Sequence, residues 1–523
     1  MTAEEPVPVA DQPLSPISFL LRSAEVWADR PAVQDGDDVA DFAQHLAKVE
    51  RARGLLAGEY GIRDGDRVAA LLPNTPALLE LHYAVPGSGA VLVPMNTRLS
   101  SGDYAYILDH SGASLVVADD MYREVLEAAL AAMGAGAPQV VWTGGVDDQW
   151  NEAVDSASPS GLSRPADERS LLSINYTSGT TSRPKGVMTT HRGAYLHSLG
   201  VIAEAGLTVS SAYLWTLPMF HCNGWAYTWA VTAAGAKHVC MRQVIPSAAW
   251  QALASDGITH MCAAPTVVVM LLEDGRARRL DRPVSLFVGG APPAPALLQR
   301  AAELNIAVTH LYGLTETYGP IAVCAWNPGW DQLPSAEQAR LRARQGVATV
   351  VSERLRVVDP DMADVPADGE SVGEIVMRGN NVMVGYYRDP EATAAAFRGG
   401  WFHSGDVGVM HPDHRVEIRD RLKDVIISGG ENISSVEVEQ ILSEHPGVSE
   451  AAVVAGPDEK WGEVVVAFVV ARSGARLDVD DLRSFAQSRL ARFKVPKRFH
   501  VVDRLPKTGT GKIQKFVLRQ QAP

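Results

Sequence analysis

Short apolar runs alternate with longer amphipathic stretches over roughly the first 320 residues. The runs are rich in Val, Ile and Leu, and alanine-rich segments of helical length separate them. Apolar runs set between helices predict a sheet that is covered by helices on both faces, which is an α/β architecture. The predicted strands are Arg67–Leu72, Ala90–Pro94, Ser114–Ala118, Gln139–Trp142, Leu171–Tyr176 and Val284–Val288.

The pattern changes twice in the second half of the chain. Val347–Val416 is rich in Val and Gly and carries turn signals such as Ala367-Asp368-Gly369, which predicts a small β-barrel subdomain. From Arg421 onward, a capped helix beginning at Ser434, two Val-rich strands, a second helix and a final strand predict a compact α+β unit. We therefore expect a large N-terminal body of two α/β subdomains plus the barrel, residues 1–420, and a C-terminal domain, residues 421–523.

One uncharged segment is long enough to cross a bilayer. No Asp, Glu, Lys or Arg occurs between Ala205 and Ala236. The segment nevertheless contains Pro218, His221 and Asn223, whose polar groups lipid cannot satisfy. A buried segment that lines a pocket is the better interpretation, and we expect no stable membrane insertion.

Composition narrows the functional class. The chain has 523 residues and a formal net charge of −14, which argues against nucleic acid as a partner. Four Cys with no Cys-x-x-Cys pair exclude a disulfide scaffold and a Cys-based zinc site. The N-terminal residues lack the basic segment of an export signal. A cytoplasmic location is therefore expected.

Positive charge is concentrated near the C-terminus, where a single Asp503 opposes it. Such a cluster on an acidic protein predicts a phosphate-bearing ligand at the C-terminal domain, although any single member can be an ordinary solvated side chain. The ten basic residues are Arg489, Arg492, Lys494, Lys497, Arg498, Arg504, Lys507, Lys512, Lys515 and Arg519.

The first chemical motif follows the predicted strand Leu171–Tyr176. Hydroxyl residues, a glycine and Lys185 on one loop can surround a polyphosphate with hydroxyl, backbone N–H and ammonium donors. The order differs from a P-loop, because Lys185 follows a proline and precedes a glycine. The expected phosphate-binding residues are Thr177, Ser178, Gly179, Thr180, Thr181 and Lys185.

Further motifs follow this loop in a fixed order along the chain. They are Gly289-Gly290-Ala291-Pro292, Tyr312-Gly313-Leu314-Thr315-Glu316-Thr317, Ser404-Gly405-Asp406, Arg421-Leu422-Lys423-Asp424 with Gly429-Gly430-Glu431-Asn432, and Pro506-Lys507-Thr508-Gly509-Thr510-Gly511-Lys512. Together with the phosphate loop they resemble the adenylate-forming superfamily over almost the whole chain, most closely the short- and medium-chain acyl-activating enzymes. The resemblance implies that MgATP and a carboxylic acid give an acyl-adenylate, which coenzyme A then converts to a thioester.

The resemblance also assigns roles around the nucleotide. Thr315 is expected to bond the α-phosphate and Glu316 to hold Mg²⁺, a cation that prefers oxygen ligands. Tyr312 is expected to stack on adenine, with Gly290 and Ala291 on its other side. Asp406 and Arg421 are expected to contact the ribose.

The C-terminal domain is implied to be mobile and to serve both half-reactions. Lys512 would bridge the carboxylate and the α-phosphate, and Lys423 would be the hinge. Gly429, Gly430 and Glu431 would border the pantetheine tunnel. Trp461 and Phe493 would stack on the CoA adenine, with plain core packing as the alternative for Trp461.

The acid-binding residues are implied to be apolar or neutral. His221 is expected to stand between the acyl site and the thiol tunnel, and a base role toward the thiol is a further option. The expected pocket residues are His221, Asn223, Trp225, Tyr227, Val288, Gly289, Tyr312, Gly313 and Tyr318. An apolar acid is favoured, because a substrate ammonium would lack a partner here.

Several alternatives remain open at the level of sequence. Trp225 favours a short or medium fatty acid, and a flat aryl or cinnamoyl-type acid follows closely. A carrier protein could replace CoA, and a homodimer is compatible with the chain. A luciferase-like oxygenase and a non-catalytic nucleotide-binding scaffold are the other classes.

Two segments depart from the family pattern. Ser182-Arg183 stands where many members have Gly, and Asp37–Arg51 lacks the usual Leu-Thr-Tyr opening of a strand and helix. The rest of the motif set is intact, which argues for an active enzyme.

Overall fold

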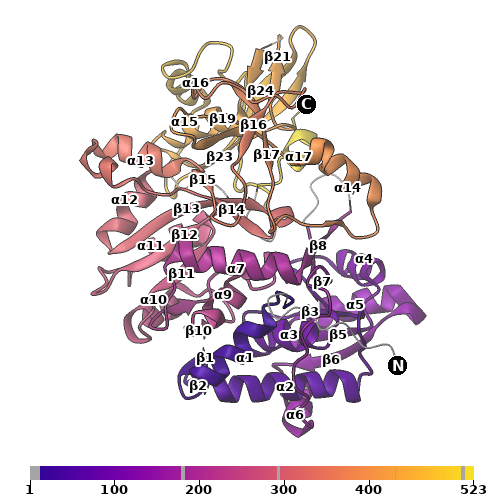
Figure 1. Ribbon diagram of the computed structural model, residues 1–523. Coiled ribbons are helices and arrows are strands. Elements are labelled where there is room, and N and C mark those ends of the chain that lie inside the picture. The colour runs from indigo at the N-terminus through magenta and orange to yellow at the C-terminus, as the bar shows by residue number, and fades with distance from the viewer. Residues whose placement is uncertain (1–11, 178–182, 291–294, 430, 508–512, 523) are drawn as a thin grey trace.

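The computed structural model describes residues 12–177, 183–290, 295–429, 431–507 and 513–522. The predicted α/β body and the separate C-terminal domain are both present (Figure 1). The body contains two large sheets, whose strands include all six of the predicted apolar runs.

The first large sheet has seven strands in the order β18-β8-β7-β4-β3-β5-β6. Strands β3 to β7 run parallel, and β8 and β18 are antiparallel additions at one edge. Most positions of the inner strands β3 to β5 are buried, as expected where helices cover both faces. The strands are β3 (Arg67–Leu71), β4 (Val91–Pro94), β5 (Leu115–Asp119), β6 (Gln139–Thr143), β7 (Leu171–Tyr176), β8 (Gly186–Thr190) and β18 (Gly385–Tyr386).

The second large sheet has nine strands in the order β15-β14-β13-β12-β11-β9-β10-β1-β2. Its central strands are parallel, and β2, β14 and β15 are antiparallel. They are β1 (Pro31–Asp35), β2 (Asp38–Asp41), β9 (Ala212–Leu214), β10 (Lys237–Cys240), β11 (His260–Ala263), β12 (Val284–Val288), β13 (Ile306–Leu314), β14 (Gly319–Val323) and β15 (Val347–Ala348).

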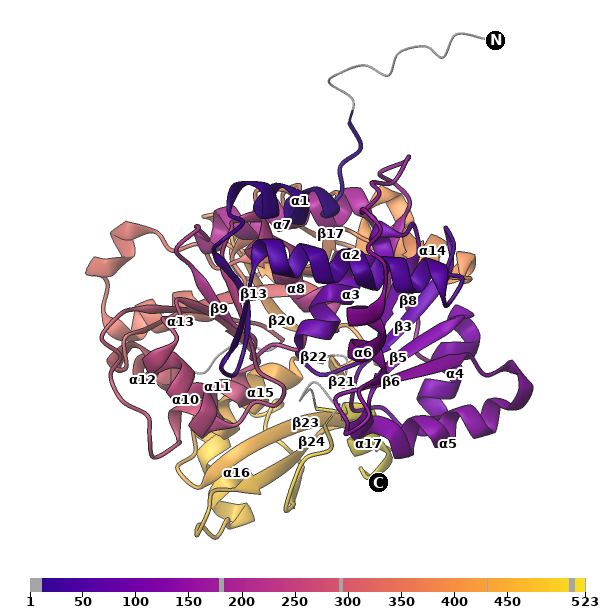
Figure 2. The same cartoon turned by 90° about the horizontal axis from the view of Figure 1, so that it is seen from below.

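Helices separate the two sheets and cover their outer faces. The inner layer contacts strands of both sheets and shares one apolar core with them (Figure 2). It consists of α1 (Ile17–Val26), α2 (Phe42–Gly58), α3 (Pro76–Gly87), α7 (His191–Ala205) and α9 (Tyr227–Ala233). The outer helices are α4 (Ser101–Ser111) and α5 (Arg123–Met133) on one side, and α10 (Pro246–Ser255), α11 (Pro265–Leu272) and α12 (Pro295–Glu303) on the other.

The segment that lacks the usual family opening still folds as a strand followed by a helix. Asp41 ends β2 and caps α2, because its side chain accepts from the backbone N–H of Gln44, whose own side chain accepts from the N–H of Asp41. This capping box satisfies two N–H groups that the helix start leaves without partners. The departure in sequence therefore does not change the local structure.

The small β subdomain is a four-stranded antiparallel sheet in the order β16-β17-β19-β20. Among the described residues, an isolated bridge between Gly346 and Val416 continues the pairing beyond β20, and no strand pairing joins β20 back to β16, so the expected barrel is seen as a four-stranded sheet without closure. The strands are β16 (Arg356–Val358), β17 (Val372–Met377), β19 (Phe402–Met410) and β20 (Val416–Arg421). Helix α14 (Pro390–Ala396) contacts β19, whereas α13 (Ser335–Ala343) contacts α12 and β13 of the larger body.

The C-terminal domain has the predicted α+β order, with a hairpin and a last helix in addition. The side chain of Ser434 accepts from the N–H of Glu437 and so begins the helix that follows, as its sequence predicts. The elements are β21 (Ile426–Ser428), β22 (Glu431–Ile433), α15 (Ser435–Ser443), β23 (Val448–Asp458), β24 (Gly462–Ala471), α16 (Val479–Gln487), β25 (Arg498–Val501) and α17 (Lys515–Gln520).

The uncharged segment Ala205–Ala236 is folded into the body. It forms β9, a short turn and α9, and most of its residues are buried. No helix among the described residues is long and apolar enough to cross a membrane.

Candidate active site

The predicted phosphate loop leaves the carboxyl end of β7 and returns into β8. A pair of hydrogen bonds closes the base of the loop: the N–H of Thr177 donates to the carbonyl of Lys185 at 3.0 Å, and the N–H of Lys185 donates to the Thr177 hydroxyl at 3.3 Å. The two ends of the loop are therefore fixed side by side. Ser178, Gly179, Thr180 and Thr181 lie outside the described residues.

Lys185 and Glu316 meet at one tyrosine that the sequence did not single out. The Lys185 ammonium lies 4.7 Å from the ring centroid of Tyr386. The Tyr386 hydroxyl donates to a Glu316 carboxylate oxygen at 2.8 Å. The fold thus brings together the two residues expected at the phosphates and the cation, although 131 positions separate them in sequence (316 − 185).

Thr315 and Glu316 lie on a single 3₁₀ turn, η3 (Thr315–Thr317), directly after β13. The N–H of Leu314 donates to the Thr317 hydroxyl at 2.9 Å, and the same hydroxyl donates to the carbonyl of Gly319 at 2.6 Å. These bonds fix the turn from both sides. Burial raises the pKa of the adjacent Cys222 thiol to about 12, with a hydrogen bond to Thr315 acting in the opposite direction.

The two residues expected at the ribose are already held together. The Tyr312 hydroxyl donates to one oxygen of Asp406 at 2.6 Å, and the Arg421 guanidinium pairs with the other oxygen at 2.8 Å. The carboxylate is only 3% exposed. Burial and the nearby Asp406 charge raise the pKa of Tyr312 well above its ordinary value, so the phenol remains a donor.

Gly290, expected beside the adenine, is exposed and has φ 91°. A Cβ at Gly290 would meet no atom within 4 Å among the described residues. The expected adenine-lining role is compatible with this open position. Ala291, its expected partner, lies outside the described residues.

The segment expected to line the acyl pocket has an unusual backbone. All five residues from Cys222 to Ala226 have φ between 43° and 62°. Left-handed conformations normally occur at single residues, because the Cβ approaches the following carbonyl. Cys222–Trp225 (α8) is therefore a left-handed turn, and no sequence signal predicted it beyond Asn223 and Gly224.

Buried polar contacts hold this turn. The Ser173 hydroxyl donates to the side-chain oxygen of Asn223 at 3.0 Å, and the side-chain amide of Asn175 donates to the carbonyl of Phe220 at 3.1 Å. The Thr228 hydroxyl donates to the carbonyl of Asn223 at 3.0 Å. The turn is thus tied to β7, the strand that carries the phosphate loop.

Trp225 packs against two glycines from different strands. A Cβ at Gly289 would lie 2.7 Å from the indole, and a Cβ at Gly319 would lie 3.2 Å from it. Gly313 is equally confined, because its Cβ would lie 2.0 Å from the carbonyl oxygen of Gly319. Trp225 is 6% exposed, so its ring fills the space at this end of the site.

Four other expected pocket residues are more deeply buried than Trp225. Val288 belongs to the apolar core under α10 to α12. Tyr227 stacks on Tyr213 with ring centroids 4.7 Å apart, and the Tyr318 hydroxyl accepts from the Trp229 indole at 2.8 Å. Asn223 and these three side chains are each at most 2% exposed, and their expected place in the acyl pocket stays a prediction.

His221 precedes the left-handed turn and is half-buried. Its backbone N–H donates to the carbonyl of Pro218 at 3.1 Å. The side chain therefore starts where the chain enters the turn that carries Trp225. Its expected gating role stays a prediction.

The residues expected at the thiol lie in the C-terminal domain. The N–H of Gly429 donates to the carbonyl of Trp461 at 2.9 Å, and a Cβ at Gly429 would lie 2.6 Å from the Trp461 ring. Trp461 and Phe493 are 44% and 42% exposed, so neither is core packing. Glu431 is exposed on β22, and Gly430 and Lys512 lie outside the described residues.

Lys423, the expected hinge, lies two residues after the end of β20. Its carbonyl accepts from the Arg519 guanidinium at 2.8 Å, and the same guanidinium pairs with Asp424. The last helix, α17, is therefore attached to this connection. The domain boundary at 420/421 stays a prediction.

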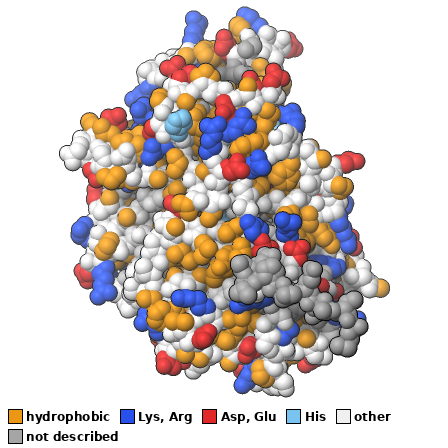
Figure 3. Space-filling model, viewed as in Figure 1, with side chains coloured by type: hydrophobic (Ala, Val, Ile, Leu, Met, Phe, Trp, Pro, Cys, Tyr) orange, Lys and Arg blue, Asp and Glu red, His pale blue; other side chains and the backbone are white. Residues whose placement is uncertain are grey.

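Much of the basic C-terminal cluster is paired with acidic side chains. Five of its ten members pair with carboxylates from other parts of the chain, so those five do not present free positive charge to a phosphate. Figure 3 shows basic and acidic side chains next to each other on the visible face of this domain. The pairs are Lys494 with Glu437, Arg489 with Glu444, Lys507 with Glu450, Lys515 with Glu439, and Arg519 with Asp424.

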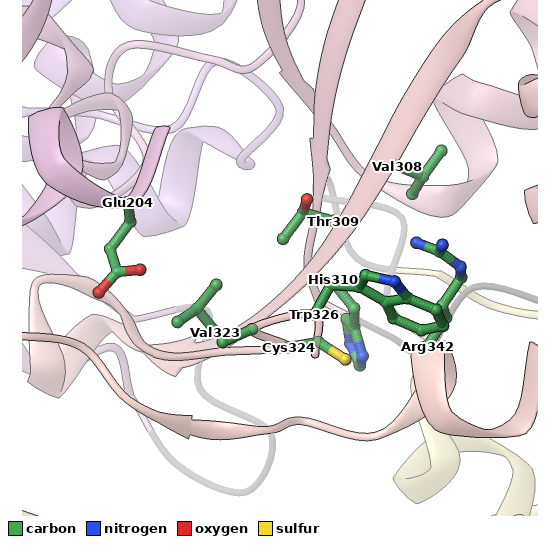
Figure 4. A pocket seen from close by; sticks show the side chains of 9 residues that line it. Glu204, Val308, Thr309, His310, Val323, Cys324, Trp326 and Arg342 are labelled. Atoms are coloured by element: carbon green, nitrogen blue, oxygen red, sulfur yellow. The ribbon is translucent and has the colours of Figure 1, made fainter. Parts of the chain in front are cut away.

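Figure 4 shows a pocket of about 150 Å³ that contains none of the predicted site residues. It lies at β13 and β14, with Glu204 of α7 on one side and Arg342 of α13 on the other. The Arg342 guanidinium lies 3.6 Å from the centroid of Trp326, which fills one wall. None of the predicted phosphate, ribose or acyl residues therefore lines this pocket.

Within the described ranges, no group of three or more His, Cys, Asp or Glu side chains is arranged to hold a metal. Glu316 offers one hard carboxylate beside Lys185. This donor set fits a cation such as Mg²⁺ that takes its remaining ligands from phosphates and water.

Comparison with known proteins decides the family. The model of the AMP-binding enzyme family matches residues 20–387, and that of the AMP-binding enzyme C-terminal domain matches residues 437–512. The chain belongs to the AMP-binding enzyme family. The predicted membership of the adenylate-forming superfamily is confirmed, and with it the class of enzyme, an AMP-forming acyl-CoA ligase.

Its relatives in this family include plant and archaeal enzymes. The chain is 42% identical to 2-methylpropanoate–CoA ligase CCL4 of Humulus lupulus, over 99% of this chain and 97% of that one. It is 41% identical to probable acyl-activating enzyme 5, peroxisomal, of Arabidopsis thaliana, over 100% and 98%. It is 42% identical to 4-hydroxybutyrate–CoA ligase 2 of Metallosphaera sedula, over 97% and 94%.

Solved structures of AMP-binding enzymes have the same fold. ATP-bound MatB of Rhodopseudomonas palustris superposes with a TM-score of 0.86 at 28% identity, covering 97% of this chain and 98% of that one. The o-succinylbenzoate CoA synthetase of Bacillus subtilis with its acyl-adenylate gives 0.84 at 28% identity, over 97% and 98%. Apo MatB gives 0.75 at 27% identity over the same shares, so the arrangement of this chain is closer to the ATP-bound form.

Proposed function

We propose that this protein joins a short-chain carboxylic acid to coenzyme A, with ATP and Mg²⁺ as cosubstrate and cofactor. The observation that supports the size of the acid is the packing of Trp225 against Gly289 and Gly319, which fills the end of the site. The names of the 2-methylpropanoate and 4-hydroxybutyrate ligases among its relatives agree with a short acyl chain.

In the first half-reaction, a carboxylate oxygen of the acid attacks the α-phosphorus of ATP. A carbon–oxygen–phosphorus linkage forms, the α–β anhydride bond breaks, and pyrophosphate leaves. Lys185 and the Thr177 hydroxyl donate to the phosphates that carry the departing charge, and Thr315 donates to the α-phosphate. A bound Mg²⁺ at Glu316 would neutralise phosphate charge.

In the second half-reaction, the CoA thiolate attacks the acyl carbon of the adenylate. A carbon–sulfur bond forms, the acyl–phosphate bond breaks, and AMP leaves with the electron pair. Tyr312, Asp406 and Arg421 hold the nucleoside through both steps. The exposed rings of Trp461 and Phe493 support CoA as acceptor, because flat aromatic side chains stack on adenine.

A panel of acids tests the substrate. Purified protein with ATP, Mg²⁺ and CoA is given straight acids from acetate to dodecanoate, 2-methylpropanoate, 4-hydroxybutyrate, benzoate and cinnamate, and free thiol consumption and AMP release are measured. We expect the highest kcat/KM at two to five carbons. A maximum at ten or more carbons, or with cinnamate, would contradict the assignment in favour of a long-chain or aryl acid.

We also propose CoA as the acyl acceptor and a cytoplasmic location for the protein. A holo carrier protein offered in place of CoA is expected to be acylated at less than a hundredth of the CoA rate, and equal rates would reverse this choice. Light scattering tests the homodimer. We propose a cytoplasmic location, which fractionation tests against the peroxisome named for the Arabidopsis relative.

A further inference from the structure

We infer that Tyr386 is a positioning residue that sets the places of both the cation ligand and the phosphate-binding lysine. This inference rests on the proposed function and identifies a residue that none of the motifs singled out. Tyr386 contacts each of the two groups through a different part of its side chain.

The hydroxyl of Tyr386 acts on the carboxylate. It donates to one oxygen of Glu316 at 2.8 Å. Burial and the neighbouring Glu316 charge raise the pKa of Tyr386, which keeps the phenol in its donating form. A carboxylate that ligates a metal with one oxygen is oriented by a hydrogen bond to the other, and loss of such a partner typically costs 10–100-fold in metal affinity.

The ring of Tyr386 acts on the lysine. Lys185 places its ammonium 4.7 Å from the ring centroid, within the range of a cation–π contact. Lysine has a flexible four-carbon stem, and the ring restricts where its charge lies. The Tyr386 side chain therefore positions both the Lys185 ammonium and the Glu316 carboxylate.

The position of Tyr386 itself is determined by three contacts of its backbone and neighbours. It pairs with Val187 of β8, the strand that follows the phosphate loop, and its N–H donates to the Thr393 hydroxyl at 2.9 Å. The N–H of Met383, three residues earlier, donates to the backbone carbonyl of Glu316 at 2.7 Å. The segment 383–386 thus holds the Glu316 backbone and side chain at once.

Gly385 allows this close approach. It has φ 146°, and a Cβ there would lie 2.8 Å from the Thr393 side chain. A side chain at this position would clash with Thr393, whose hydroxyl accepts from the N–H of Tyr386. The chain therefore carries a glycine next to the tyrosine for a steric reason.

The test separates the two parts of the side chain. Tyr386→Phe removes only the hydroxyl, and Tyr386→Leu removes the ring as well. Tyr387→Phe is the matched control, because this neighbour loses a hydroxyl from a ring that faces His110, 5.8 Å away. Binding of Mn²⁺ in the presence of α,β-methylene-ATP is measured by electron paramagnetic resonance, which does not depend on turnover.

We expect Tyr386→Phe to weaken Mn²⁺ binding about 10-fold and to raise the Mg²⁺ concentration for half-maximal activity equally. The KM for ATP at saturating Mg²⁺ should change less than about 2-fold, because the ring still holds Lys185. Tyr386→Leu should raise that KM at least ~3-fold further. In a Glu316→Gln background, Tyr386→Phe should have no additional effect on Mn²⁺.

Mn²⁺ binding by Tyr386→Phe within 2-fold of the wild type would overturn the inference. An equal loss in Tyr387→Phe would also overturn it, since the effect would then be a general one of the segment. If the wild type itself bound no Mn²⁺ with the analogue and activated no acid, the proposed function would fall first. Thermal unfolding midpoints identify any variant that is misfolded. If Tyr386→Phe is misfolded, the Mn²⁺ binding and the KM for ATP of Tyr386→Leu are used in its place.

Discussion

Tyr312 donates a 2.6 Å hydrogen bond to Asp406 across 94 residues of sequence. The contact joins the long strand β13 of the nine-stranded sheet to β19 of the small antiparallel sheet. Arg421, the last residue of β20, pairs with the same carboxylate. The expected ribose residues therefore come together at the junction of two subdomains.

Removing the Tyr312 hydroxyl tests this junction. Tyr312→Phe leaves a 3% exposed carboxylate with one donor fewer, and hydrogen bonds to charged groups contribute about 1.5–3 kcal/mol. We expect the KM for ATP to rise at least ~10-fold in pyrophosphate exchange. Tyr195→Phe, a tyrosine stacked on Phe19 in the inner helix layer, is the control. An unchanged KM in Tyr312→Phe would exclude a role of the pair in nucleotide binding.

Lys512 is expected to act in the first half-reaction and not in the second. Lys512→Ala is expected to abolish pyrophosphate exchange, since single preorganised donors are worth about 3–4 kcal/mol, and to leave thioester formation from supplied acyl-AMP largely intact. Lys507→Ala in the same segment is the control, because that lysine pairs with Glu450. An equal fall of both half-reactions would show that Lys512 does not act in adenylation alone.

Trp225 is expected to limit the length of the acid. Trp225→Gly opens the space at Gly289 and suits the positive φ of 53° at this position. Each additional buried methylene then contributes about 0.8 kcal/mol, so the optimum should move to longer acids by at least two carbons. Gly289→Ala should act in the opposite direction, because its Cβ would lie 2.7 Å from the indole. The kcat/KM of both variants over the acid panel checks this, and an unmoved optimum would place the pocket elsewhere.

Trp461 should affect the second half-reaction only. Stacking of a base on an aromatic side chain is worth about 1–3 kcal/mol, so Trp461→Ala should raise the KM for CoA at least ~5-fold and leave pyrophosphate exchange unchanged. Val501→Ala, another exposed apolar residue of the domain at 48% exposure, is the control. If Trp461→Ala impaired both half-reactions alike, its role would be structural.

His197 makes stability depend on pH. Burial lowers its pKa from 6.5 to about 4. Between those values the unfolded chain binds a proton that the folded chain does not, so the free energy of unfolding falls as the pH falls through this window, by up to about 3 kcal/mol. His197→Leu should lessen the drop in the urea midpoint between pH 7.5 and pH 5, and His414→Asn on an exposed turn should not. If the urea midpoint of His197→Leu dropped as much as that of the wild type, the pH dependence of stability would come from groups other than His197.

The sequence by itself determined the body plan. Apolar runs such as Arg67–Leu72 and Leu171–Tyr176 form inner strands whose central residues are buried, because helices cover both faces of such a sheet. Ser434 capped its helix as predicted, because a cap depends on residues three positions apart. The family motifs identified the class of enzyme for the same reason: their residues stand close together in the chain.

Only the tertiary structure decided what depends on contacts between distant segments. Five C-terminal cations are paired with carboxylates, and Tyr227, Val288 and Tyr318 are fully buried, because ion-pair partners and burial both depend on tertiary packing. The left-handed turn at Cys222–Trp225 and the position of Tyr386 between Lys185 and Glu316 are also products of packing. Local sequence carries periodicity and capping, whereas long-range hydrogen bonds arise only when the two sheets and the small antiparallel sheet meet.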